Sequence, residues 1–131
     1  VLVVDDEAVV RNFLKESLES KGYRVMLAKN GKEGVEQYRH NAKEISLVIL
    51  DIIMPEMTGE EALKHIREIN PDSRILITTG FAHDPERNDQ LSKLAQGYLQ
   101  KPFDHHDLLS KVREVLDGKS RAPTRQPALN Q

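Results

Sequence analysis

The sequence predicts an α/β fold in which five parallel strands alternate with five helices. Short apolar runs alternate along the chain with stretches whose apolar residues recur at helical spacing. The strongest run, at 47–50, holds four aliphatic residues and is typical of a strand buried on both faces of a parallel sheet. Strands and helices in alternation form such a sheet with right-handed crossovers and helices on both faces.

The first three strand–helix pairs are expected at 1–4 and 8–20, at 23–28 and 31–40, and at 47–50 and 58–69. Gly22 ends the first helix, in the position that favours a C-terminal glycine. Thr58 is the expected N-cap of the third helix, and Glu61 completes a capping box. Apolar residues recur at helical spacing in each helix, and Val35 and Tyr38 are expected to point inward; the others are Val10, Phe13, Leu14, Leu18, Ala62, Leu63, Ile66 and Ile69.

The last two pairs are expected at 75–79 and 85–94, and at 97–100 and 104–116. Pro85 suits the first turn of its helix. The final helix turns five aliphatic residues inward: Leu108, Leu109, Val112, Val115 and Leu116. Residues 118–131 contain two prolines and few apolar residues. We therefore expect one domain over 1–117 and a flexible tail or linker over 118–131.

Composition excludes several kinds of protein. The 131 residues fit one domain, and the absence of cysteine excludes disulfides and thiolate metal sites and suits a cytoplasmic location. Residues 1–117 hold 16 basic and 21 acidic side chains, which argues against direct nucleic-acid binding. No apolar run approaches the roughly 18 residues of a membrane span, so we expect no membrane insertion. The chain begins inside a strand-like run and without Met, so we expect a fragment of a longer product.

Polar side chains stand at the carboxyl ends of four predicted strands. Asp5 and Asp6 follow the first, Asp51 the third, Thr79 ends the fourth and Lys101 follows the fifth. Parallel strands bring their carboxyl ends to one edge of the sheet, where α/β proteins bind ligands. We therefore expect these five side chains to form one site.

Three carboxylates at one point repel each other, and a hard divalent cation removes the conflict. Mg²⁺ prefers oxygen ligands, and Mn²⁺ is an alternative. One carboxylate can then attack phosphorus to give an aspartyl-phosphate. Lys101 would neutralise a phosphoryl oxygen and the Thr79 hydroxyl would donate a hydrogen bond to another, which is what phosphoryl transfer requires.

Over residues 1–117 the chain resembles the receiver domains of bacterial response regulators. The matching motifs are Val-Val-Asp-Asp-Glu at 3–7, Leu-Asp-Ile-Ile-Met-Pro at 50–55 followed by Gly59, Thr-Gly at 79–80 and Lys-Pro-Phe at 101–103. Their spacing also matches, with 45 residues from Asp6 to Asp51, 28 on to Thr79 and 22 on to Lys101. The resemblance implies a flavodoxin-like, doubly wound sheet of strand order 2-1-3-4-5 with five helices.

The resemblance also implies a role for each matching residue. Asp51 corresponds to the phosphoacceptor. The corresponding metal ligands are Asp6 directly, Asp5 through water, Asp51, and the main-chain carbonyl of Ile53. Thr79, Gly80 and Lys101 correspond to the phosphoryl-binding residues, Thr79 and Tyr98 to the conformational switch, and Pro102 to a cis-proline.

These roles imply a signalling domain rather than an enzyme, with self-catalysed phosphotransfer and slow autodephosphorylation only. It would take its phosphoryl group from the phosphohistidine of a histidine kinase or phosphotransfer domain and signal through residues 85–117, where a homodimer would also form. Ile53 and Phe81 stand at the two positions that tune hydrolysis in this family. Neither can hydrogen-bond an attacking water, so we predict a long-lived phosphoaspartate.

Other functions fit the residues less well. The domain could be the receiver module of a hybrid histidine kinase rather than a stand-alone regulator. An aspartate-dependent phosphohydrolase of the haloacid-dehalogenase type needs a second acid two residues after the nucleophile, where this chain has Ile53. A flavodoxin-like cofactor binder needs a phosphate loop where residues 5–7 are acidic, and a degenerate receiver lacks an acid or the lysine.

Overall fold

The computed structural model describes residues 1–80 and 85–118, which form five strands and five helices in strict alternation. All strands are parallel and their order is β2-β1-β3-β4-β5, so the predicted doubly wound fold is confirmed. The strands are β1 (Leu2–Val4), β2 (Met26–Ala28), β3 (Val48–Asp51), β4 (Ile75–Thr79) and β5 (Gly97–Gln100). The helices are α1 (Ala8–Glu19), α2 (Gly31–Asn41), α3 (Gly59–Ile69), α4 (Pro85–Leu94) and α5 (His105–Leu116).

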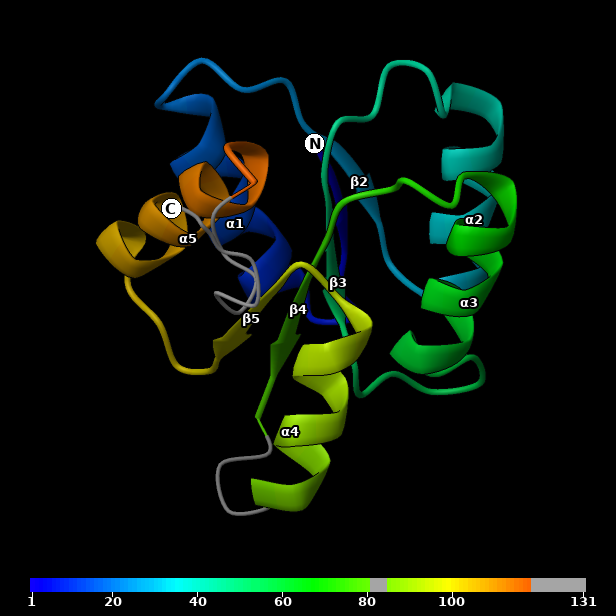
Figure 1. Ribbon diagram of the computed structural model, residues 1–131. Helices are drawn as coiled ribbons and strands as arrows, with labels where there is room; N and C mark the ends of the chain where they lie inside the picture. Colours follow the sequence, from blue (N-terminus) through cyan, green and yellow to red (C-terminus); the bar gives the residue numbers. More distant parts are fainter. Residues whose placement is uncertain (81–84, 119–131) are drawn as a thin grey trace, which may run out of the picture.

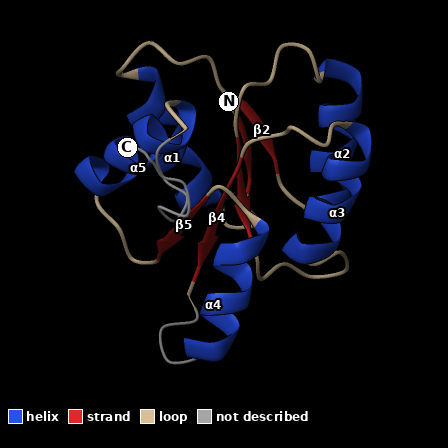
Figure 2. Cartoon of the chain, viewed as in Figure 1, coloured by secondary structure: helices blue, strands red, loops and turns tan. Residues whose placement is uncertain are grey.

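The sheet forms the middle layer, with helices on either side (Figure 2). Helices α1 and α5 cover one face, and α2 and α3 cover the other (Figure 1). Two buried clusters match these layers: one joins α1 and α5 to the sheet, and the other joins α2 and α3 to it, together with Leu94 and Ala95 at the end of α4. Because β1, β3 and β4 are buried on both faces, their side chains divide alternately between the two clusters.

Local signals place the helix ends where the sequence predicts. The capping box of α3 is present, with the Glu61 amide donating to the Thr58 hydroxyl at 3.2 Å and the Thr58 amide donating to the Glu61 carboxylate at 2.9 Å. Gly22 follows α1 with a φ of 87°, which only glycine adopts without strain. The predicted cis bond between Lys101 and Pro102 is present.

One predicted boundary is wrong. The second strand begins at Met26 rather than at residue 23, since its ladder with β1 starts with the Leu2–Met26 pair. Phe13 is 36% exposed, and its ring packs against that of Phe103, with centroids 6.2 Å apart. The tail prediction falls outside the described residues. None of the helices in the described ranges is long and apolar enough to cross a membrane.

Candidate functional site

The strand ends bring the predicted residues to one edge of the sheet. Asp51 is the last residue of β3 and pairs in register with Thr78, while Val4 at the end of β1 pairs with Leu50. Thr79 ends β4 opposite Gln100, the residue before Lys101. The short strands and their common direction therefore gather side chains that are up to 96 residues apart in sequence.

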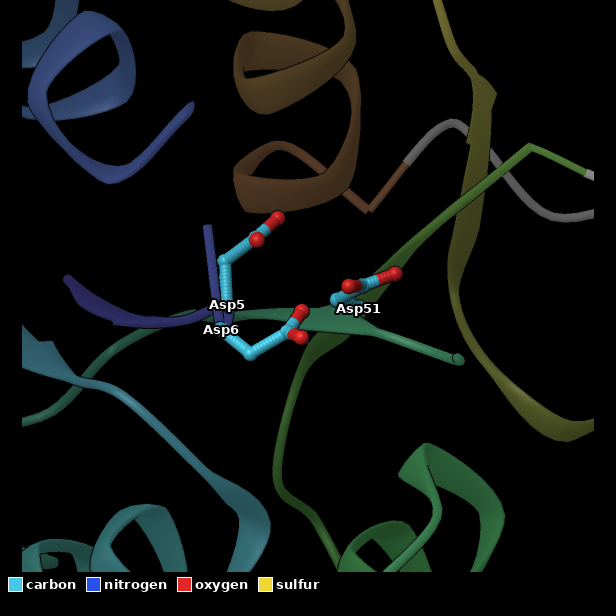
Figure 3. A group of neighbouring side chains, drawn as sticks. All are labelled: Asp5, Asp6 and Asp51. Atoms are coloured by element: carbon cyan, nitrogen blue, oxygen red, sulfur yellow. The ribbon is translucent and has the colours of Figure 1, made fainter. Parts of the chain in front are cut away.

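Three carboxylates meet at this edge. Asp5, Asp6 and Asp51 each contribute an oxygen, and these atoms lie within 4.8 Å of one another. Figure 3 shows the three side chains grouped beside the ends of β1 and β3. Asp5 and Asp51 are 1% and 3% exposed, whereas Asp6 lies open to solvent. Two buried acids and one exposed acid thus share a space small enough for one ion.

Lys101 lies among these acids. Its Nζ donates to Asp5 Oδ2 at 3.1 Å and lies 3.6 Å from Asp51 Oδ2. It also donates to Glu7 Oε1 at 3.3 Å. Glu7 was not among the predicted site residues, although its place directly after the Asp5–Asp6 pair was a signal that a further acid reaches the site.

Main-chain groups fix the two buried carboxylates. The Ile53 amide donates to Asp51 Oδ1 at 3.3 Å, and the Glu7 amide donates to Asp5 Oδ1 at 2.9 Å. Arg11, one turn into α1, donates from Nη1 to the Asp5 carbonyl at 2.8 Å, a contact that no sequence pattern indicated. Gly59 lets α3 start against the end of β3, because a Cβ there would lie 2.4 Å from the Asp51 carbonyl oxygen.

Burial and, after it, the neighbouring Asp5 carboxylate together raise the pKa of Asp51 to about 7, although Lys101 opposes the shift. Burial also raises the pKa of Asp5. Burial lowers the pKa of Lys101, but Asp51 and Asp5 together outweigh it, so that the net shift is upward. The ammonium group of Lys101 therefore stays charged. Its single positive charge does not balance the carboxyl groups of Asp5, Glu7 and Asp51 around it.

The donor set fits a hard divalent cation. Carboxylate oxygens are the ligands that Mg²⁺ prefers, and Mg²⁺ usually binds through one or two of them while keeping several waters. Both oxygens of Asp5 already accept hydrogen bonds, from the Glu7 amide and from Lys101. Asp6 is exposed and Asp51 accepts one hydrogen bond, from the Ile53 amide, so these two carboxylates keep more lone pairs for a metal ion than Asp5 does.

For the remaining predicted residues, the structure gives the position but does not test the predicted role. Thr79 is fully buried at the end of β4. Tyr98 packs against the cluster under α2 and α3, and its buried hydroxyl has no hydrogen-bond partner within the described ranges. Ile53 is 49% exposed, and a Cβ added at Gly80 would meet no atom within 4 Å in the described part of the chain. Phe81 lies outside the described residues. The ligand roles of Thr79, Gly80 and the Ile53 carbonyl stay predictions.

Comparison with known proteins matches residues 1–113 to the response regulator receiver domain. The chain is 34% identical over 117 residues to the sensor kinase CckA of Brucella abortus (strain 2308), covering 89% of this chain and 12% of that protein. It is 37% identical over 116 residues to the response regulator MprA of Mycobacterium sp. (strain KMS), covering 88% and 50%. The chain thus spans half or less of the length of these two relatives.

Among solved structures, the response regulator protein TrrA from Thermotoga maritima, in complex with Mg(2+)-BeF, has a TM-score of 0.77 and 38% identity. The similarity covers 87% of this chain and 96% of TrrA.

Proposed function

The chain belongs to the response regulator receiver domain family, and on that premise we propose that Asp51 accepts a phosphoryl group from a phosphohistidine. One observation carries the proposal: a carboxylate that is 3% exposed lies within 4.8 Å of two further acids and 3.6 Å from an ammonium group. An aspartate that only caps a strand end does not require two neighbouring acids and an ammonium group around it. The activity is that of a signalling domain rather than of an enzyme with turnover.

Each residue then has a stated task. An Asp51 oxygen forms a bond to phosphorus as the phosphorus–nitrogen bond of the phosphohistidine breaks, and the electron pair leaves with the imidazole. The Ile53 amide, on Oδ1, holds the carboxylate in place. Lys101 moves its charge from the acids to a phosphoryl oxygen, and Thr79 donates a hydrogen bond to another. Mg²⁺, held by Asp6 and Asp51 and by Asp5 through water, would neutralise charge on the phosphoryl group.

The structure of TrrA with Mg(2+)-BeF supports this assignment, because the similarity to that protein covers 87% of this chain and 96% of TrrA. The partner is a histidine kinase or phosphotransfer domain, and the added charge of about −1.5 to −2 shifts the domain between two conformations through Thr79 and Tyr98. CckA is a sensor kinase and MprA a response regulator, so both a hybrid kinase and a separate regulator are consistent parents. The signalling surface at 85–117 and a cytoplasmic location stay predictions.

A small phosphodonor tests the acceptor. We expect incubation with acetyl phosphate and Mg²⁺ to add one phosphate by intact mass, and Asp51→Asn to abolish the gain. Asp72→Asn is the matched control, because Asp72 is exposed in the turn before β4, at the opposite end of the sheet. The same gain in Asp51→Asn would move the site elsewhere, and repeated turnover of the donor would favour a phosphohydrolase.

The lifetime of the phosphorylated protein tests the role of Ile53. Its half-exposed hydrocarbon side chain stands next to Asp51 and offers no hydrogen bond to a water. We expect the phosphate to persist well beyond seconds after the donor is removed, and Ile53→Asn to shorten the lifetime. Loss within seconds from the wild type would contradict the proposal.

A further inference from the structure

Thr78 lies beside Asp51, and its hydroxyl is buried without a partner. The ladder pairs Asp51 with Thr78 and Thr78 with Leu99. Thr78 is 1% exposed, and its Oγ1 makes no hydrogen bond to any part of the chain that the structure describes. A buried hydroxyl without a partner destabilises the fold, so its presence in a central strand needs an explanation.

The alternation of side chains places Thr78 on the same face as Asp51. Ile49 and Leu76 both belong to the cluster under α1 and α5, and Asp51 and Thr78 follow them by two residues on their strands. Paired residues on neighbouring strands are about 4.8 Å apart, so rotation of the two side chains can bring a hydroxyl to a carboxyl oxygen. On the other side of Thr78, Leu99 offers no acceptor. Along this row, Asp51 is the acceptor within reach.

In the structure the Asp51 oxygens are engaged elsewhere. Oδ1 accepts from the Ile53 amide, and Oδ2 faces Lys101. Phosphorylation changes the second of these contacts, because one oxygen becomes the bridge to phosphorus and Lys101 turns to the phosphoryl group. The other oxygen becomes a carbonyl that can accept a hydrogen bond from a new direction.

We propose that Thr78 is a positioning residue, whose hydroxyl donates to the unbridged oxygen of Asp51 once that residue carries a phosphoryl group. The inference rests on the proposed function and adds a residue to it. Because the hydroxyl gains its partner only in the phosphorylated state, it favours that state over the resting one. It also holds the acyl group in the plane that directs phosphorus toward Lys101.

Beryllofluoride, which binds carboxylates reversibly as a phosphoryl mimic, provides an equilibrium test. By calorimetry in Mg²⁺, we expect Thr78→Val to weaken beryllofluoride binding about ten-fold, the value of one hydrogen bond to a charged or polar acceptor. Thr78→Ser keeps the hydroxyl and should bind within about three-fold of the wild type. Affinity for Mg²⁺ alone should be the same in all three proteins, and metal-free Thr78→Val should unfold at the same or a higher temperature.

Two results would overturn the inference. One is equal beryllofluoride affinity in Thr78→Val and the wild type. The other is a parallel loss of Mg²⁺ affinity and thermal stability in Thr78→Val, which would mark the hydroxyl as structural. These results differ from those expected if Asp51 is not the acceptor. In that case beryllofluoride would bind neither the wild type nor Asp51→Asn, or would bind both equally.

Discussion

Replacing Asp51 with asparagine should stabilise the metal-free protein at neutral pH, although it removes the proposed acceptor. The folded pKa of Asp51 is about 7, against about 3.9 for an unfolded aspartate. The folded protein therefore binds more protons than the unfolded chain between these values, and its stability falls as the pH rises through that window. Asparagine has the same shape and no charge, so it avoids this loss.

The size of the effect follows from the two pKa values. The destabilisation by ionised Asp51 amounts to roughly 4 kcal/mol at pH 7.5 and roughly 1.5 kcal/mol at pH 5. We expect Asp51→Asn to raise the free energy of unfolding by these amounts as upper limits, because Lys101 also loses one of its partners. The change with pH is the more specific part of the prediction.

Urea unfolding in EDTA at pH 5 and 7.5 measures this difference. The exposed Asp72→Asn should change little at either pH, and saturating Mg²⁺ should raise the stability of the wild type more than that of Asp51→Asn. An increase for Asp51→Asn that is equal at both pH values would show that Asp51 does not titrate in this window. A loss of stability at pH 7.5 would show that the Lys101 ion pair outweighs burial and repulsion.

Three further perturbations test the site and its scaffold. Mg²⁺ at about 100 times its dissociation constant should raise the free energy of unfolding of the wild type by about 2.7 kcal/mol. Most of this gain should disappear in Asp6→Asn, and thermal melts with and without EDTA measure the difference. Gly59→Ala should cost about 2–4 kcal/mol in urea, because its Cβ would lie 2.4 Å from the Asp51 carbonyl oxygen, whereas Gly80→Ala, with open space, should cost under about 1 kcal/mol. Glu61→Ala removes half of the capping box and should cost about 0.5–1 kcal/mol; an unchanged urea midpoint would deny the box any energetic role.

The fold was predictable because its signals are local. Aliphatic runs identify β3 and β4, and an N-cap with its paired glutamate identifies the start of α3. The length of β2 was less predictable, since residues 23–25 have strand-like character but lie before the first ladder pair, Leu2–Met26. Pairing is decided by the neighbouring strand and not by the residues themselves.

The site was predictable as far as strand ends determine it. The sequence placed Asp5, Asp6, Asp51 and Lys101 at one edge, and the structure brings them together. It did not indicate that Glu7 reaches Lys101 or that Arg11 binds the Asp5 carbonyl, because both contacts depend on how α1 leaves β1. The unpaired Thr78 hydroxyl was equally invisible, since threonine is an ordinary strand residue until its neighbours are known.

The charges around Lys101 argue for an order of events. Its ammonium lies within 3.6 Å of carboxylates from Asp5, Glu7 and Asp51, and Asp6 belongs to the same cluster. Within the described ranges, Lys101 is the one side chain that forms ion pairs with these acids. A phosphoryl group brings further negative charge to a site where one cation already faces an excess of acids. Cation binding should therefore precede phosphoryl transfer, and phosphorylation without a divalent ion should be undetectable even at high donor concentration.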